Sequence, residues 1–522
     1  MSAPPDAHRY PTKHLAVFIY ALTGGGAQRR TLTLANAFCA AGHEVDVVVV
    51  RGGGPLEAHL DPRIRLVALD HPTRPFSAPI RAVRARGLAT AASIPALARY
   101  LRREQPDLLL SAALHVNLVA VAAWRLARLP IALVLRASNH PSGNLDAFPP
   151  AQRLVRLWLR WLLRRMYPKA DAVIAVSEGV RLELARLTGL SRERIHLIYN
   201  PVVTPELEAR MAAEPDHPWL KAEFPPVVLA AGTFKLQKDF PTLIDAFARA
   251  REQRPLRLIL LGDGRLRPLL AQRVRQLGLE EHVAMPGFVL DPLPWMRRAR
   301  VVVLSSRWEG LPGVLIEAMA CGTPVVATDC PSGPREILEG GRLGPLVPVG
   351  DAEALARAIC AVLDHPPDAA RLRARAADFA LDAAVPHYLA VIEACIRARA
   401  PERLARIPPW PVQKPLAFST PMGLDYALGR LGLARSALFR PFAGNAPHRQ
   451  LMARMMERFG VVVEEAAARA WEELVEADLR CYGCGVRRLC RRWLARPKGY
   501  PEFCPNAGLF ARLAGTGPHV TG

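Results

Sequence analysis

One stretch in the second half of the chain limits the fold more than any other. Residues 301–304 are four consecutive apolar residues, as in a strand buried on both faces of a parallel sheet. A loop containing Glu309 follows, then a short apolar segment with Glu317 that stops at Gly322, and then a second apolar run, Pro324–Thr328. The order predicts strand, loop, helix and strand. In α/β proteins, such a unit binds anionic ligands at the N-terminus of its helix.

Length and charge narrow the class of protein. A chain of 522 residues, 51% of them hydrophobic, is too long for one core and predicts two or three domains. The formal net charge of +22 allows nucleic acid, an anionic membrane or a phosphorylated substrate as partner. It is equally compatible with arginine-rich codon usage alone. No nucleic-acid-binding motif is present, so we expect no nucleic acid partner.

The sequence also bears on localisation. The apolar run 15–22 is short and lacks a cleavage site, and the segment 108–124 is too short to span a bilayer and contains polar residues. Most cysteines are scattered, which is unlike a secreted disulfide framework. We therefore expect a cytoplasmic protein, either soluble or resting on the inner face of a membrane.

The N-terminal part begins with a strand, a glycine loop and a helix. The apolar run Leu15–Tyr20 precedes a loop with Gly25 and Gly26, an amphipathic helix over 28–41 and a second strand, Val45–Val50. This is the start of a doubly wound sheet. The loop lacks the G-x-G-x-x-G spacing of dinucleotide sites, so a tight turn and a ligand loop are both open interpretations.

Two histidines follow predicted strands. His115 comes just after Pro106–Ser111, and His140 comes just after Ile131–Arg136. The carboxyl ends of parallel strands form the edge at which ligands bind in open α/β sheets. A structural role and a role in a site are both open for this pair.

A basic, aromatic-rich helix is predicted over residues 151–169. The segment has six basic residues, no acidic residue, and interleaved Leu and Trp. This composition is typical of a helix on a membrane surface. The alternative is a surface helix whose apolar face packs on its own domain.

A second alternating series of strands and helices begins at Val227. Two successive series of similar size predict an α/β protein with two Rossmann-like domains that face each other across a cleft. The predicted division is an N-terminal Rossmann-like domain (14–205), a C-terminal Rossmann-like domain (206–399), a Pro-rich linker (400–445) and a small, mainly helical, cysteine-containing domain (446–522).

Several motifs in order resemble those of retaining family-4 glycosyltransferases, which have the GT-B fold. They are Thr23–Ala27 with Leu34-Ala35-Asn36 and Gly42-His43-Glu44-Val45, then Gly232 with Gln237-Lys238-Asp239-Phe240, Leu261-Gly262-Asp263-Gly264, Pro286-Gly287-Phe288, and Glu309–Glu317 continuing through Cys321–Ala327. The resemblance covers about residues 14–399. It implies that 14–205 is the acceptor domain and that 206–399 is the nucleotide-sugar domain, with a return helix at its end. It is strongest to bacterial enzymes that build lipopolysaccharide, capsule or lipid-linked glycans.

The resemblance implies a role for individual residues. Glu317 would hold the ribose of a nucleotide-sugar, Glu309 would lie by the donor sugar, and Lys238 would pair with the diphosphate. His115 would lie near the transferring sugar. The other implied donor-binding residues are Gly232, Thr233, Gly287, Phe288, Gly310, Leu311, Pro312 and Gly313, and the acceptor side would include Gly25, Gly26 and His140.

Thr233 departs from the family pattern. Most relatives have an arginine at this position, so one phosphate-binding charge is missing. Either Lys235 or an arginine from the N-terminal domain compensates, or donor affinity or activity is reduced.

The resemblance implies a transferase, and the chemistry of the residues agrees with it. Helix N–H groups and a lysine stabilise a diphosphate leaving group without a metal, and no Asp-x-Asp pair stands out, so we expect no cofactor for transfer. The predicted reaction moves a hexose or N-acetylhexosamine, with retention, from a nucleoside diphosphate sugar to a bacterial glycan or lipid-linked acceptor. The alternatives are a nucleotide-sugar epimerase of GT-B fold and a non-catalytic nucleotide-sugar sensor with a metal-binding tail.

Four cysteines close to the C-terminus form a separate cluster. They are Cys481, Cys484, Cys490 and Cys504, the last followed by proline. Four thiols at this density predict a zinc site or an iron–sulfur cluster, although the spacing matches neither cleanly. Free thiols are the alternative.

Overall fold

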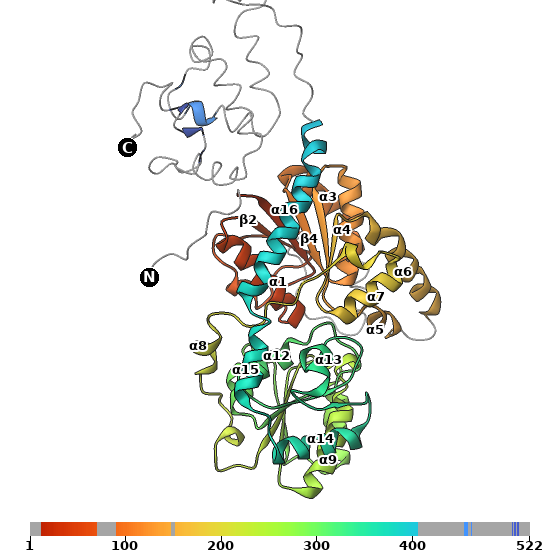
Figure 1. Ribbon diagram of the computed structural model, residues 1–522, viewed down its shortest axis with the longest axis vertical. Coiled ribbons are helices and arrows are strands. Elements are labelled where there is room, and N and C mark those ends of the chain that lie inside the picture. Colours follow the sequence, from red (N-terminus) through yellow and green to blue (C-terminus); the bar gives the residue numbers. More distant parts are fainter. Residues whose placement is uncertain are drawn as a thin grey trace, which may run out of the picture. The chain divides into compact units, whose positions relative to one another are not determined.

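The computed structural model describes residues 12–69, 90–147 and 152–405, together with residues 454–457, 461, 504, 506, 507, 509 and 510. Residues 15–400 form one compact unit, and the C-terminal segment belongs to a second. The first unit contains two parallel sheets, each flanked by helices (Figure 1). The predicted pair of Rossmann-like domains is confirmed.

The N-terminal sheet has seven strands in the order β3-β2-β1-β4-β5-β6-β7. The strands are β1 (His14–Ile19), β2 (Glu44–Val49), β3 (Arg65–Ala68), β4 (Leu108–Ala112), β5 (Ala132–Ala137), β6 (Ala172–Ala175) and β7 (Ile195–Leu197). Its helices are α1 (Gly26–Ala40), α3 (Ile94–Glu104), α4 (Leu114–Ala127), α5 (Pro141–Asp146), α6 (Arg153–Met166) and α7 (Glu178–Thr188). The strand order reverses between β1 and β4, which pair in parallel.

The C-terminal sheet has six strands in the order β10-β9-β8-β11-β12-β13. The strands are β8 (Val227–Ala231), β9 (Arg257–Leu261), β10 (Val283–Gly287), β11 (Val301–Leu304), β12 (Val325–Thr328) and β13 (Leu346–Val347). Its helices are α8 (Leu207–Met211), α9 (Phe240–Gln253), α10 (Arg267–Gln276), α11 (Leu293–Arg298), α12 (Gly313–Ala320), α13 (Pro334–Ile337), α14 (Ala352–Asp364) and α15 (Ala369–Ala377). The order reverses between β8 and β11.

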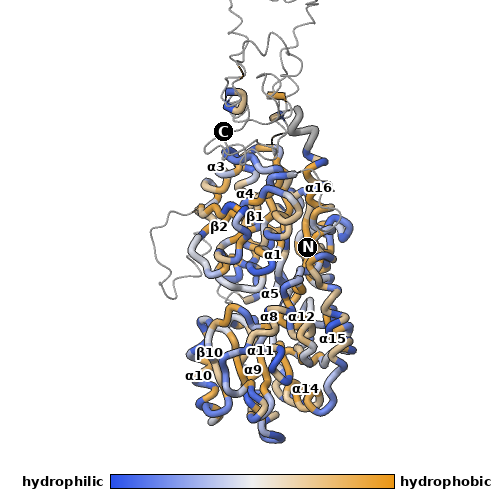
Figure 2. Tube along the Cα trace, turned by 90° about the vertical axis from the view of Figure 1, so that its left-hand side faces the viewer, coloured by the Kyte–Doolittle hydropathy of each residue, from blue (hydrophilic) through white to orange (hydrophobic). Residues whose placement is uncertain are grey.

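Continuous apolar runs form the strands at the centre of each sheet. All four residues of β11 and all five of β4 are buried, as expected when helices cover both faces of a parallel sheet. Figure 2 shows hydrophobic segments concentrated in the strands. The predicted helix over 28–41 begins two residues earlier, because the Gln28 side chain accepts a hydrogen bond from the Gly25 N–H and caps its first turn.

The last long helix returns to the N-terminal domain. Helix α16 (Leu381–Ala405) follows the C-terminal domain in sequence but lies against the N-terminal sheet (Figure 1). The Tyr388 hydroxyl accepts a hydrogen bond from Arg136 Nε at 2.9 Å, and Arg399 pairs with Asp171 at 2.8 Å. The return helix that the sequence predicted is therefore present, and both of these contacts attach it to the N-terminal domain.

Candidate active site

The predicted site residues follow the strands at which each sheet reverses its order. Gly25 and Gly26 come after β1, His115 after β4, Gly232 and Lys238 after β8, and Glu309 after β11. The carboxyl ends of these strands are the topological switch points, where ligands bind in open α/β folds.

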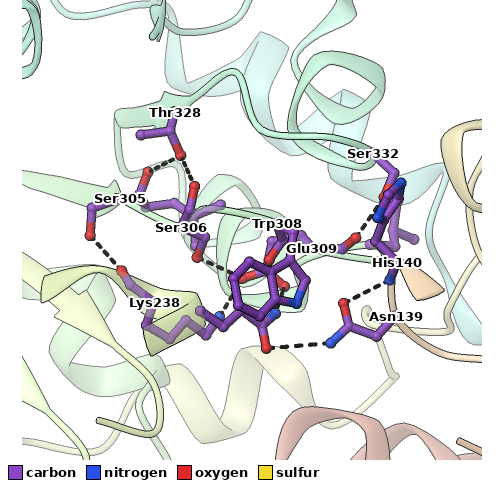
Figure 3. Close-up of polar contacts among 12 residues, drawn as sticks. Asn139, His140, Lys238, Ser305, Ser306, Trp308, Glu309, Thr328 and Ser332 are labelled. Carbon is purple, nitrogen blue, oxygen red and sulfur yellow. Dashed lines mark hydrogen bonds and ion pairs between the residues drawn. The ribbon is translucent and has the colours of Figure 1, made fainter. Parts of the chain in front are cut away.

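Glu309 is buried and fully engaged by neighbours in its own domain (Figure 3). Its Oε1 accepts hydrogen bonds from Lys238 Nζ and from Ser306 Oγ, each at 2.7 Å. Gln237 Nε2 donates to Oε2 at 3.3 Å. Lys238 and Glu309 therefore form a buried ion pair, with two further side chains hydrogen-bonded to the carboxylate.

The Lys238 side chain is oriented by the loop between β8 and α9. The Lys238 backbone carbonyl accepts a hydrogen bond from Ser305 Oγ at 2.8 Å, which ties this loop to the end of β11. Gly232, at the start of the loop, lies beside the Lys238 chain, so that a side chain at Gly232 would meet Lys238 Cε at 3.0 Å. The sequence-predicted neighbours Gly232, Lys238 and Glu309 are therefore brought together.

Two further residues of this loop were singled out by the sequence. Thr233 is exposed, and no described contact gives it a charged partner. Burial, together with the nearby Lys238 ammonium, lowers the pKa of Lys235. Lys235 is thus a second cation in the loop, close enough to Lys238 for the two charges to repel each other.

Glu317 pairs with an arginine of the other domain. Arg30, on α1, forms an ion pair with Glu317, on α12, and both side chains are buried. Arg30 Nη1 also donates to the carbonyl of Val202 at 3.4 Å, while Arg30 Nε is buried and has no hydrogen-bond partner among the described residues. A side chain at Gly313, at the start of α12, would lie 3.1 Å from Arg30 Nη2. The guanidinium therefore lies at the N-terminal turn of α12, where helices favour anions.

The glycine-containing loop from Gly310 to Gly313 is held by the N-terminal domain. The Gly310 carbonyl accepts a hydrogen bond from Ser177 Oγ at 2.8 Å, and the Leu311 carbonyl accepts one from Asn200 Nδ2 at 3.3 Å. Pro312 is the residue before α12 and Gly313 is its first residue.

Helix α5 of the N-terminal domain packs directly on the loop that carries Glu309. Asn144 Oδ1 accepts a hydrogen bond from Trp308 Nε1 at 3.2 Å, and Asn139 Nδ2 donates to Gln237 Oε1 at 3.3 Å. A side chain at Gly143 would lie 2.3 Å from the Trp308 ring, closer than atoms can approach. Only glycine at position 143 allows the two domains to meet here.

The two predicted histidines occupy different environments. His140 caps α5, accepting a hydrogen bond at Nδ1 from the Gly143 N–H at 3.1 Å, and burial lowers its pKa. Figure 3 places it beside Asn139, on the N-terminal side of the Glu309 loop. His115 is exposed in the first turn of α4, with its ring centroid 5.9 Å from that of Tyr20. No described hydrogen bond links His115 to Glu309 or Lys238.

The remaining predicted residues line the loops where the two domains face each other. Gly25 precedes α1 and Gly26 begins it. Gly287 ends β10, and the ring of the next residue, Phe288, is half-exposed. A Cβ atom added at Gly24 would lie only 2.7 Å from Phe288 Cζ. The glycine loop after β1 and Phe288, after β10, are therefore neighbours.

The four-cysteine cluster lies largely outside the described residues. Cys481, Cys484 and Cys490 are not among them, and only Cys504 is, as a partly exposed side chain. Within the part of the chain that the structure describes, no group of three metal-ligating side chains occurs. The zinc or iron–sulfur hypothesis stays a prediction.

The sequence interpretation missed the residues that connect the two domains. Arg30, Asn139 and Trp308 were not singled out, although each contacts a predicted site residue or its immediate neighbour. A local signal existed only for Trp308, a large aromatic residue next to Glu309 in a polar loop.

Comparison with family models finds three matching segments, and they follow the order of the N-terminal domain, the C-terminal domain and the cysteine-containing tail. Residues 24–205 match the model described as Glycosyltransferase Family 4, and residues 225–365 match Glycosyl transferases group 1. Residues 440–516 match a family of unknown function, DUF6455.

Similar proteins of known activity come from bacteria. The chain is 31% identical over 205 residues to N-acetylgalactosamine-N,N'-diacetylbacillosaminyl-diphospho-undecaprenol 4-alpha-N-acetylgalactosaminyltransferase of Campylobacter jejuni, covering 39% of this chain and 54% of that protein. It is 36% identical over 193 residues to the lipopolysaccharide core biosynthesis glycosyltransferase LpsE of Rhizobium meliloti, covering 37% of this chain and 54% of that protein. The chain thus matches about half the length of these relatives.

Solved structures share the fold. Anabaena Alr3699/HepE in complex with UDP-glucose has a TM-score of 0.57 at 22% identity, and Thermosynechococcus elongatus sucrose-phosphate synthase has 0.59 at 24%. The alignments cover 73% and 74% of this chain and 100% of each neighbour. From the order of its domains, the geometry of its switch points and these matches, the chain has the GT-B fold, and its two domains are similar to family 4 and group 1 glycosyltransferases.

Proposed function

We propose that this protein transfers a hexose or N-acetylhexosamine from a nucleoside diphosphate sugar, with retention of anomeric configuration, to a bacterial surface glycan or lipid-linked acceptor. The observation that carries the proposal is the buried Lys238–Glu309 pair at the β8/β11 switch point, with Glu317 on the helix that follows. The names of the similar transferases and the UDP-glucose complex of a fold neighbour support it.

The proposed chemistry assigns the leaving group to the C-terminal domain. As the bond between the anomeric carbon and the diphosphate oxygen breaks, negative charge develops on that oxygen. Lys238 and the N-terminal turn of α12, which lie at the same switch point, would stabilise this charge. Glu309 keeps the Lys238 ammonium in place, and Glu317 would accept hydrogen bonds from the ribose hydroxyls.

Retention requires the acceptor to attack from the face that the diphosphate leaves. In the proposed step the acceptor oxygen bonds to the anomeric carbon, and the acceptor proton passes to the departing phosphate oxygen. No nucleophilic carboxylate is assigned, in contrast to the covalent route of retaining glycosidases.

Arg30 is our candidate for the charge that Thr233 lacks. Its guanidinium lies between Gly313 and Glu317, at the N-terminal turn of α12, and its buried Nε has no partner within the part of the chain that the structure describes. Arginine keeps its charge when buried, whereas the pKa of Lys235 is already lowered by its surroundings. Arg30 is therefore favoured over Lys235 as the compensating cation.

The test incubates the full-length protein with a panel of nucleotide-sugars and bacterial membrane extracts, using Lys238→Met as the inactive control. We expect donor-dependent glycan transfer with the α-configuration retained. Tight donor binding without turnover would favour a sensor, and conversion of the sugar without transfer would favour an epimerase. Either result would overturn the proposal.

A further inference from the structure

Helix α6 exposes an apolar stripe to solvent. Leu154 is 81% exposed, Leu157 51%, Trp158 58% and Trp161 54%. Spacings of three and four residues place all four side chains on one face of the helix. Large apolar residues grouped in this way mark an interaction site, unlike single exposed hydrophobic residues.

The charges around this stripe have one sign. Residues 151–169 contain no acidic residue. The exposed Arg153 and Arg164 lie along one border of the stripe, and Arg165 continues it, with its guanidinium 5.8 Å from the centroid of a Trp161 ring. The opposite face holds the helix in place, through the buried Leu163 and through Arg160, which pairs with Asp146 at 3.0 Å.

The stripe lies one helix away from the candidate active site. Asp146, the partner of Arg160, is the last residue of α5, and α6 lies beside α5 and α7 (Figure 1). Asn144, also on α5, bonds Trp308 next to Glu309. A surface bound by α6 would therefore be close to the N-terminal side of the site.

We propose that the α6 stripe binds the surface of an anionic lipid bilayer. Leu154, Leu157, Trp158 and Trp161 would enter the interfacial region, and the arginines would contact acidic headgroups. The helix would lie in the plane of the bilayer, because its apolar residues form a stripe along its length. Among the described helices, none is long and apolar enough to cross a membrane. This inference deepens the proposed function, since a lipid-linked acceptor is itself held in a bilayer.

A bilayer fits this surface better than a second copy of the chain. In a symmetric dimer, the stripe of one subunit would pack on the same stripe of the other. Arg153, Arg164 and Arg165 would then lie close to the same arginines of the second subunit, and their like charges would repel one another. Aromatic residues at the level of the headgroups, with arginines beside them, are typical of interfacial helices.

The experiment measures co-sedimentation of the full-length protein with vesicles, without donor or acceptor. We expect binding to vesicles of phosphatidylglycerol and phosphatidylcholine in equal parts, weak binding to pure phosphatidylcholine, and loss of binding in high salt. Arg153→Gln/Arg164→Gln should weaken binding roughly tenfold or more, because each basic residue near the surface contributes about 1 kcal/mol. Trp158→Ser/Trp161→Ser should also weaken binding roughly tenfold or more, because two aromatic side chains no longer enter the interfacial region.

A matched control changes an exposed leucine and an exposed arginine on α10, as Leu269→Ser/Arg275→Gln. This control should bind as the unchanged protein does. Fluorescence adds a second measurement: vesicles should shift tryptophan emission to the blue, and the shift should be lost in the double tryptophan variant. Circular dichroism verifies folding.

Equal vesicle binding by the α6 variants and the α10 control would overturn the proposal. The proposal would also be overturned if the unchanged protein did not bind anionic vesicles and instead formed dimers that the tryptophan substitutions dissociate. Neither outcome would affect glycan transfer from a nucleotide-sugar to a detergent-dispersed acceptor, so failure of this proposal is distinguishable from failure of the proposed function.

Discussion

The two sides of the domain interface hold their polar groups in different ways. On the C-terminal side, Glu309, Lys238 and Ser306 satisfy one another within a single domain. On the N-terminal side, Arg30 and Asn139 reach their partners across the interface. The first arrangement persists however far apart the domains move, whereas the second exists only when they meet. The Lys238–Glu309 pair is thus preorganised within one domain, whereas the contacts of Arg30 and Asn139 require the two domains to meet.

The largest expected effect comes from breaking the preorganised pair. Lys238→Met leaves Glu309 buried without its cation and removes the charge that faces the leaving group. We expect the initial rate of nucleotide release to fall by roughly a hundredfold or more, as when one transition-state donor is lost. Glu309→Ala should lower kcat more than donor affinity. Lys235→Met is the matched control and should cost far less; equal losses in both lysine variants would contradict the assignment.

A smaller effect should separate the two roles at α12. Glu317→Gln should weaken both uridine and UDP binding about tenfold, because the ribose loses a charge-assisted hydrogen bond. Arg30→Met should weaken UDP but leave uridine unchanged, since its proposed partner is the diphosphate. Calorimetric titration with both ligands distinguishes the variants. If Arg30→Met weakened uridine as much as UDP, Arg30 would act on Glu317 alone.

The smallest effect should come from the contact between the domains. Gly143→Ala places a methyl group against the Trp308 ring and should hold the domains apart, lowering kcat several-fold while leaving nucleotide binding to the C-terminal side intact. Adding Trp308→Ala to this variant should restore space for the methyl group. The double variant should therefore lose less kcat than the combined losses of the two single variants. Small-angle scattering would measure the opening. Strictly additive losses with an unchanged radius of gyration would argue against closure at this point.

The sequence predicted the parts of the fold that depend on local pattern. Continuous apolar runs identified the central strands, the loops after them contained Lys238 and Glu309, and the short helix that follows contained Glu317. The edge strands β3 and β13 were missed, because they are short and only partly buried.

The interdomain contacts were missed for a different reason. Arg30 sits next to another arginine on an amphipathic helix and has the local pattern of a solvent-exposed residue. Its burial depends on Glu317, 287 residues further along the chain. A pairing at that separation leaves no trace in the spacing of neighbouring residues, so only the folded structure reveals it.

The most direct test of the donor-site assignment is a crystal structure of the protein with UDP. The account predicts the ribose hydroxyls on the Glu317 carboxylate, and the diphosphate between Lys238 and the first turn of α12. A nucleotide bound elsewhere, with Glu317 still paired only to Arg30, would contradict it.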